Sequence, residues 1–301
     1  MLITAAIMAR AQKPDTAQVL VHYKFSHIRD TTNRANPYTE NMVLIVGKKA
    51  AAYKSYDGQM ENALFKKEMQ EKMANSPDGN VSINRRSTAS GTEYYQFPNE
   101  NKIARKEPLV FNKYLITDAL PPMDWKISGD TATFGGLHCQ KATTHFKGRD
   151  YTAWFCPDMP LHVGPWKLNG LPGMIVQAYD RKKEVVFKFD GVEKAVVTPQ
   201  KDDHAAGPVA DSQGQTVVMI GMDDQETDPN IIQLPANAIK TTEKEFANLR
   251  AAMRKDPNAF VQSLVDAQAS NTPGGRPAPK IDIKMGPEQV INNPIELPEK
   301  K

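Results

Sequence analysis

Aromatic and basic side chains suited to ligand binding gather in one stretch of the chain. They are Lys141, Arg149, Tyr151, Trp154, Trp166 and Asn169. An amine beside an indole ring contributes about 0.5 to 1 kcal/mol by cation–π attraction at an exposed site. One interpretation is a binding lip of aromatic faces with basic rims, suited to a peptide or an amphiphile. The other is a structural corner, in which tryptophans close one end of a curved sheet.

Trp166 and Asn169 belong to the segment GPWKLNGLPGMI, which runs from Gly164 to Ile175. Glycine adopts positive φ without steric cost, and proline fixes φ and removes an amide donor. A tryptophan in such a segment adds a large amphipathic ring that has to pack somewhere. The density of these residues predicts a loop of fixed shape.

The sequence has two cysteines, Cys139 and Cys156, on either side of a predicted hairpin. A two-residue turn at Lys147-Gly148 makes them direct cross-strand neighbours and sets Lys141 opposite Trp154. Opposed Cα atoms of antiparallel strands lie about 4.5 to 5.5 Å apart, within disulfide range. In an oxidising compartment we expect a bridge that closes a loop of about 16 residues and contributes roughly 3 kcal/mol. A register one residue out leaves both thiols free, and a catalytic cysteine, the remaining alternative, lacks a nearby base in the sequence.

Most of the chain alternates apolar and polar residues, as half-buried antiparallel strands do. The predicted strands are Val19–Phe25, Met42–Val46, Ala52–Tyr56, Tyr94–Phe97, Leu109–Ile116, Trp125–Ser128, Phe134–Phe146, Tyr151–Cys156, Met174–Tyr179, Val185–Phe189 and Val192–Thr198. Asp180–Lys183 and Asp190-Gly191 have the composition of hairpin turns. We therefore expect a meander from Trp125 to Thr198 that curls, because long twisted sheets do so.

Three segments have helical spacing instead. Phe65, Met69 and Met73 recur every four positions between Met60 and Ala74, which predicts a helix packed on the sheet. Thr241 or Thr242 caps a second predicted helix that ends near Arg254, and a third follows Asp256-Pro257. The predicted fold class is therefore mainly β (α+β): a curled antiparallel β-sheet meander with an inserted helix and C-terminal helices packing on it.

The predicted domain organisation has three parts. Residues 1–11 form a signal peptide, 12–236 the curved antiparallel sheet domain with its helix at 60–74, and 237–301 a helical C-terminal segment with an extended tail. Gly, Pro and Asp are frequent in Pro199–Gln215, and Gly and Pro in Asn271–Pro279, which predicts irregular loops there.

The first residues predict export. Leu2–Met8 is a short apolar run, and Ala9-Arg10-Ala11 has the small-x-small form of a signal peptidase site. We expect cleavage after Ala11 and a periplasmic or secreted mature chain. A buried N-terminal strand is the alternative for the same apolar run. No later segment approaches the roughly 20 apolar residues that a spanning helix needs.

Charge and motifs argue against several functions. The formal net charge of +3 is too small to favour nucleic-acid binding. The sequence contains no HExxH, CxxC, GxSxG or GxxxxGKS pattern. We expect no metal site and no cofactor.

The segment GPWKLNGLPGMI resembles the signature of the GLPGLI family of Bacteroidota, with Met174 in the place of a leucine. The resemblance extends through Cys139–Phe155 and Pro157–Pro160, and it includes the ending NNPIEL at Asn292–Leu297. It implies a secreted, β-rich protein of unassigned biochemical role, with outer-membrane receptors as suggested partners. Cys156 is not a fixed position of the family, so the bridge prediction depends on hairpin geometry.

Two functions from different classes follow. The first is a non-catalytic periplasmic or outer-membrane-associated accessory protein that holds a peptide, an amphiphile or a receptor segment. The second is a secreted hydrolase or metal-dependent enzyme of unfamiliar type. An apolar pocket favours the first, and a polar cleft with at least three convergent His or carboxylate groups favours the second.

Overall fold

We describe the fold from a computed structural model that covers residues 14–74, 89–196, 209–210, 216–217, 230–270 and 290–299. The predicted signal peptide with its cleavage site after Ala11 lies outside the described residues, as does the predicted loop Asn271–Pro279. Of the predicted loop Pro199–Gln215, only the two-residue strand β13 is described.

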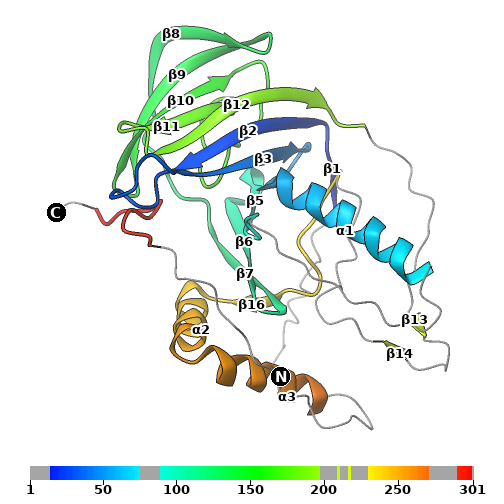
Figure 1. Ribbon diagram of the computed structural model, residues 1–301. Helices are drawn as coiled ribbons and strands as arrows, with labels where there is room; N and C mark the ends of the chain where they lie inside the picture. Colours follow the sequence, from blue (N-terminus) through cyan, green and yellow to red (C-terminus); the bar gives the residue numbers. More distant parts are fainter. Residues whose placement is uncertain are drawn as a thin grey trace, which may run out of the picture.

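The molecule is built on one large sheet (Figure 1). Its 12 strands lie in the order β16-β7-β6-β5-β4-β3-β2-β12-β11-β10-β9-β8. The bounds of these strands are β2 (Val19–His27), β3 (Tyr38–Val46), β4 (Ala51–Ser55), β5 (Glu93–Phe97), β6 (Lys102–Leu109), β7 (Asn112–Ala119), β8 (Lys126–Phe134), β9 (Leu137–Phe146), β10 (Arg149–Cys156), β11 (Met174–Asp180), β12 (Val185–Lys194) and β16 (Ile239–Thr241). Every neighbouring pair is antiparallel except β16 and β7, so the predicted antiparallel, mainly β class is confirmed.

Small elements surround this sheet. The short strands are β1 (Asp15–Thr16), β13 (Val209–Ala210), β14 (Thr216–Val217) and β15 (Ile231–Ile232), and η1 (Pro98–Glu100) is a single 3₁₀ turn. The helices are α1 (Tyr56–Ala74), α2 (Glu243–Lys255) and α3 (Pro257–Ser270). Thr242 caps α2 through a reciprocal pair of hydrogen bonds with Glu245, as the sequence predicts. Phe246 of α2 is buried against Tyr114 and Ile116 of β7, so the C-terminal helices pack on the sheet.

The predicted meander is confirmed, because β8 to β12 are consecutive neighbours. Three details of the prediction were wrong. The predicted strand Phe134–Phe146 contains the turn at Gly135-Gly136, which separates β8 from β9. The predicted strand Leu109–Ile116 is two strands, since the chain turns at Val110, which has φ 56°. Asp190-Gly191 is a bulge inside β12 and not a hairpin turn, because the residues after it continue to pair with β2. An Asp-Gly pair suits both structures, and only the partner strand decides between them.

The helix predicted at 60–74 is present as the longer α1. Asp57 in its first turn accepts hydrogen bonds from the main-chain N–H of Asn41 at 2.8 Å and from its side chain at 2.9 Å, which anchors the helix beside β3. The side chains of the predicted stripe Phe65, Met69 and Met73 lie outside the described part, so their packing on the sheet stays a prediction. The domain division at 236/237 also stays a prediction.

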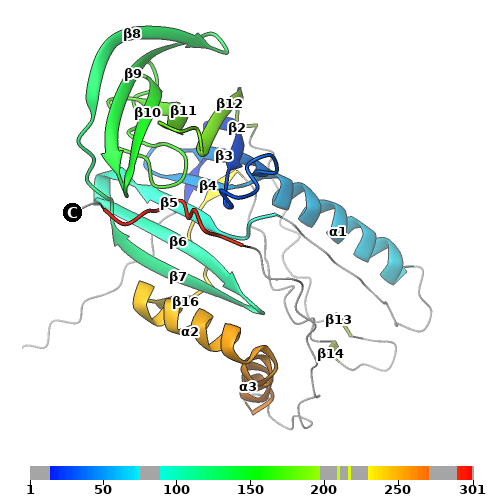
Figure 2. The same ribbon diagram turned by 60° about the vertical axis from the view of Figure 1, so that its left-hand side comes forward.

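The sheet curves strongly, and the connection between β10 and β11 lies inside the curve (Figure 2). The main core cluster forms there, between this connection and the strands β2–β4 and β9–β12. The connection contains the signature segment GPWKLNGLPGMI. The fold therefore places the most distinctive residues of the sequence against the concave side of the sheet.

Candidate functional site

The β9–β10 hairpin has the predicted register. Lys147 and Gly148 form its two-residue turn with φ of 50° and 68°, and Phe146 pairs with Arg149. Cys139 and Cys156 form a disulfide with their Cα atoms 4.3 Å apart. The bridge closes the open end of the hairpin, so the turn at the other end is held in a defined position.

The GPWKLNGLPGMI segment fills the concave side of the sheet. Trp166 is 2% exposed, and Leu168 and Leu171 are fully buried. The indole stacks on Phe187 of β12 with ring centroids 6.4 Å apart and also contacts Tyr151 at 6.3 Å. These contacts fit the predicted structural corner better than an open aromatic lip, because a buried ring cannot present its face to a ligand.

Polar contacts fix the main chain of this segment. The side-chain amide of Gln96 on β5 donates to the carbonyls of Gly164 at 2.9 Å and Trp166 at 3.0 Å. The side-chain amide of Asn169 donates to the carbonyl of Pro121 at 3.2 Å, and the main-chain carbonyl of Asn169 accepts from the indole N–H of Trp125 at 2.7 Å. Asn169 is therefore a buried link between the segment and the β7–β8 connection.

One glycine of the segment is required by space as well as by its backbone conformation. Gly173 has φ 155°, and a Cβ on it would lie 2.3 Å from the carbonyl oxygen of Cys156. The segment can therefore approach the end of β10 closely only with glycine at this position.

Lys141 and Trp154 are cross-strand partners, as predicted, but they do not join the other candidate residues. Trp154 lies one residue after Ala153 on β10, so it points to the face opposite to Tyr151 and Ala153. The amine of Lys141 pairs with Asp130 at 2.9 Å, and the Trp154 ring packs against Phe134. The six candidate residues therefore belong to two faces of the sheet, and no single surface contains them all.

Tyr151 is the most buried of the candidates on the concave side, at 1% exposed. Its hydroxyl is one of the buried polar groups without a hydrogen-bond partner among the described residues, and the hydroxyl of Tyr53 is another. Burial raises the pKa of Tyr151 above its ordinary value, so the hydroxyl stays protonated.

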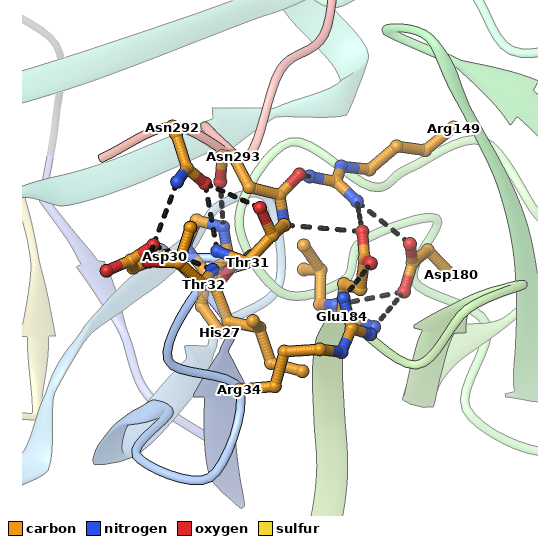
Figure 3. A network of polar contacts seen from close by, with 12 residues as sticks. His27, Asp30, Thr31, Thr32, Arg34, Arg149, Asp180, Glu184, Asn292 and Asn293 are labelled. Carbon is orange, nitrogen blue, oxygen red and sulfur yellow. Dashed lines mark hydrogen bonds and ion pairs between the residues drawn. The ribbon is translucent and has the colours of Figure 1, made fainter. Parts of the chain in front are cut away.

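Arg149 is the centre of a buried polar cluster (Figure 3). Its side chain is 2% exposed and forms an ion pair with Asp180 at 2.9 Å and a longer one with Glu184 at 3.4 Å. The rest of the guanidinium donates to Asn293 Oδ1 at 2.7 Å and to the carbonyls of Pro294 at 2.7 Å and Ile295 at 2.9 Å. A buried cation with this many acceptors is a strongly positioned group.

The two carboxylates of the cluster organise the β11–β12 turn. Asp180 accepts main-chain hydrogen bonds from Glu184 at 2.6 Å and Val185 at 2.9 Å. Glu184 also pairs with Arg34 at 2.8 Å. Burial favours a higher pKa for Glu184, but the guanidiniums of Arg34 and Arg149 hold its pKa below the ordinary value, so it stays ionised.

The third component of the cluster is the C-terminal tail, residues 290–299, which lies beside the β2–β3 loop (Figures 1 and 3). The side-chain amide of Asn293 donates to the carbonyl of Ile28 at 2.7 Å, and the main-chain carbonyl of Asn293 accepts from Nε2 of His27 at 2.8 Å. Burial lowers the pKa of His27 to about 4, so its ring is neutral near neutral pH. The Asn292 amide donates to Asp30 at 2.8 Å.

The acidic end of the tail follows the hairpin turn. Glu299 accepts from the main-chain N–H of Gly148 at 3.0 Å and from His145 at 2.8 Å. Glu296 pairs with Lys147 at 3.5 Å and also contacts the amine of Lys167. Hydrogen bonds that the His145 ring donates to the carboxylates of Asp150 and Glu299 raise the pKa of His145, which favours its charged form.

Sequence reasoning found Arg149 but missed its partners. His27, the Asp180 and Glu184 pair of the β11–β12 turn, and Asn293 come from three parts of the chain that are distant in the sequence. The available signal was the NNPIEL ending, which belongs to the family resemblance and contains Asn293. Nothing local indicated that this ending binds the β9–β10 hairpin.

The described residues contain no group of three or more His, Cys, Asp or Glu side chains placed to hold a metal ion. Among them there is also no helix long and apolar enough to cross a membrane. The guanidinium of Arg149 donates to two main-chain carbonyls and one side-chain amide of the tail, which are groups that a polypeptide offers.

Fold and site together define a curved antiparallel sheet whose concave side and hairpin end are covered by segments of the same chain. Solved structures that resemble it include two of PNGF-II. One, in space group P21, has 14% identity and a TM-score of 0.41 and matches 62% of this chain and 30% of that chain. The other, in space group C2, has 11% identity and a TM-score of 0.45 and matches 77% and 32%. The chain spans about a third of the PNGF-II chain, and scores this low carry no argument about function. No protein-family model and no curated protein matches the chain.

Proposed function

We propose that this chain is a non-catalytic accessory protein of the GLPGLI family that holds an extended polypeptide segment. The observation that carries the proposal is the use of Arg149, whose guanidinium donates to Asn293, Pro294 and Ile295 of the C-terminal tail. Main-chain carbonyls are acceptors that every peptide offers, so a buried guanidinium aimed at them is a peptide-recognition group.

The packing on the concave side favours a peptide over an amphiphile. An amphiphile needs an apolar space for its chain, and the concave side of the sheet is where that space would lie. Trp166, Leu168 and Leu171 occupy this region and are buried in the main core cluster. The remaining candidate surface is the polar hairpin end, which suits peptide groups.

The proposed location is the periplasm or the cell exterior. The Cys139–Cys156 disulfide supports it, because such bonds persist in oxidising compartments. The suggested partner is a segment of an outer-membrane receptor, in line with the family resemblance.

The proposal is tested by native mass spectrometry of the mature protein purified from its own periplasm or outer-membrane fraction, followed by denaturing release of whatever is bound. We expect a retained peptide or receptor fragment. A released lipid would show that the ligand is an amphiphile and not a peptide. An empty monomer in every fraction would overturn the binding role. The mature N-terminus, expected at Gln12, is measured in the same sample.

A further inference from the structure

The C-terminal tail is held as a peptide ligand is held, along its length and partly through its main chain. The N–H of Asn293 donates to the carbonyl of Arg29 at 3.0 Å, and the N–H of Leu297 donates to the carbonyl of Lys147 at 3.0 Å. The carbonyls between these two points accept from His27 and Arg149. Main-chain contacts of this kind supply affinity in peptide recognition.

Two asparagines supply specificity. The Asn293 side chain is buried, accepts from Arg149 at 2.7 Å and donates to the carbonyl of Ile28 at 2.7 Å and to Glu184 at 3.3 Å. Only a side-chain amide offers a donor and an acceptor in this geometry. Aspartate would place a charged acceptor against the carbonyl of Ile28 and the carboxylate of Glu184. Asn292 repeats the arrangement at the surface, where it accepts from Thr31 at 2.9 Å.

Charge complementarity extends the match to the end of the tail. Glu296 faces Lys147 and Lys167, and Glu299 faces His145. Glycine is required at position 148 of the hairpin turn, because a Cβ there would lie 2.8 Å from the carbonyl oxygen of Leu297 in the tail. The surface therefore selects an asparagine pair followed by an acidic residue and then a second acidic residue at the hairpin turn.

The binding surface is anchored on the sheet independently of the tail. Arg149 keeps its ion pair with Asp180, and Asp180 is itself fixed by the main chain of the β11–β12 turn. Glu184 keeps its pair with Arg34. Removal of the tail would thus leave the main recognition groups in place.

We infer that this surface is an exchangeable peptide site that takes residues 292–299 from a second copy of this chain in place of its own. The inference rests on the proposed function, because it specifies which site holds a polypeptide and which sequence fits. The tail of a second copy makes identical contacts, so exchange costs little energy. In the sequence, 19 residues, 271–289, separate α3 from the tail, and a chain of this length spans at most roughly 65 Å.

The experiment uses the full chain with a protease recognition site inserted after Gly275. A ¹⁵N-labelled and an unlabelled preparation are mixed in equal amounts at high concentration, incubated and then cut. Native mass spectrometry then determines which tail each body, the fragment before the cut, holds. We expect about half of the labelled bodies to hold an unlabelled tail at equilibrium, since the two tails are chemically identical.

Two variants of the unlabelled chain provide the specificity test. Asn293→Asp should reduce transfer of its tail to the labelled bodies by about tenfold or more, because the amide donor is lost at a buried position. Val290→Ser is the matched control, because Val290 is 62% exposed, and its tail should transfer like the parent tail. Equal transfer of both variant tails would overturn the assignment of Asn293 as the specificity residue.

Two further outcomes would overturn the exchangeable site. If every labelled body retains only its labelled tail, the tail is a permanent intrachain strap. If bodies lose their tails on cutting and hold none, the surface does not bind this peptide. Either result combined with a peptide released from the native periplasmic protein would overturn this site but keep a peptide-holding role, which would then depend on a surface other than that of Arg149.

Discussion

At the residue scale, two buried tyrosines provide a matched test of hydrogen bonding. The hydroxyl of Tyr23 donates to the carbonyl of Ile175 at 2.6 Å, whereas the hydroxyl of Tyr151 has no partner among the described residues. We expect Tyr23→Phe to lower the free energy of unfolding by about 1 to 2 kcal/mol and Tyr151→Phe to leave it unchanged or raise it slightly. Urea unfolding measures both. A clear loss with Tyr151→Phe would mean that its hydroxyl has a bound partner.

Trp166 provides the second residue-scale prediction. Its ring is buried between Phe146, Tyr151 and Phe187, so Trp166→Ala should lower the free energy of unfolding by about 3 to 5 kcal/mol. Trp154→Ala, at a half-buried position where the ring packs against Phe134, is the control and should cost clearly less. The measurement is chemical unfolding followed by circular dichroism. A stable Trp166→Ala protein that loses a co-purifying ligand would restore the binding-lip interpretation.

At the element scale, the β9–β10 hairpin is fixed at both ends, by its turn and by the disulfide. The double variant Cys139→Ala, Cys156→Ala should lose about 3 kcal/mol of unfolding free energy and keep its fold, because the register also follows from the Lys147-Gly148 turn. Reduction of the parent protein should give a loss of similar size. Identical unfolding curves for oxidised and reduced parent protein would contradict the prediction.

β12 shows why element boundaries were harder to predict than element types. Its residues alternate as a strand should, but the Asp190-Gly191 pair also has the composition of a turn. β2, from the start of the chain, pairs with β12 on both sides of the bulge and keeps the strand continuous. The residues around Asp190-Gly191 do not indicate that the segment pairs with β2, which is distant in the sequence.

At the scale of the whole molecule, stability should depend on pH through His27, which connects β2 to the tail. Its pKa falls from 6.5 to about 4 on burial, so the unfolded state binds the proton more readily. The stability contributed by neutral His27 is complete above pH 6.5 and is lost as the pH falls toward 4, by about 3 kcal/mol. We expect parent protein to lose this much more than His27→Gln between pH 7 and 4, measured by urea unfolding at several pH values. Parallel pH profiles would contradict the assignment.

The sequence by itself determined the local features of this protein. The Lys147-Gly148 turn predicted the hairpin register and so the disulfide. Thr241 or Thr242 indicated the start of α2, and the glycines and prolines of GPWKLNGLPGMI indicated a shaped loop. Each of these features depends on residues that are close in the chain or related by one turn.

Only the tertiary structure decided where those features act. It buried Trp166 under the curved sheet, separated Trp154 from Tyr151 and gave Arg149 partners in β11, β12 and the tail. The hydrogen bond between Arg149 and Asn293 joins residues 144 positions apart. Contacts at this separation form only when the whole sheet has assembled and curved. The free energy that favours them comes from burial that no single segment provides.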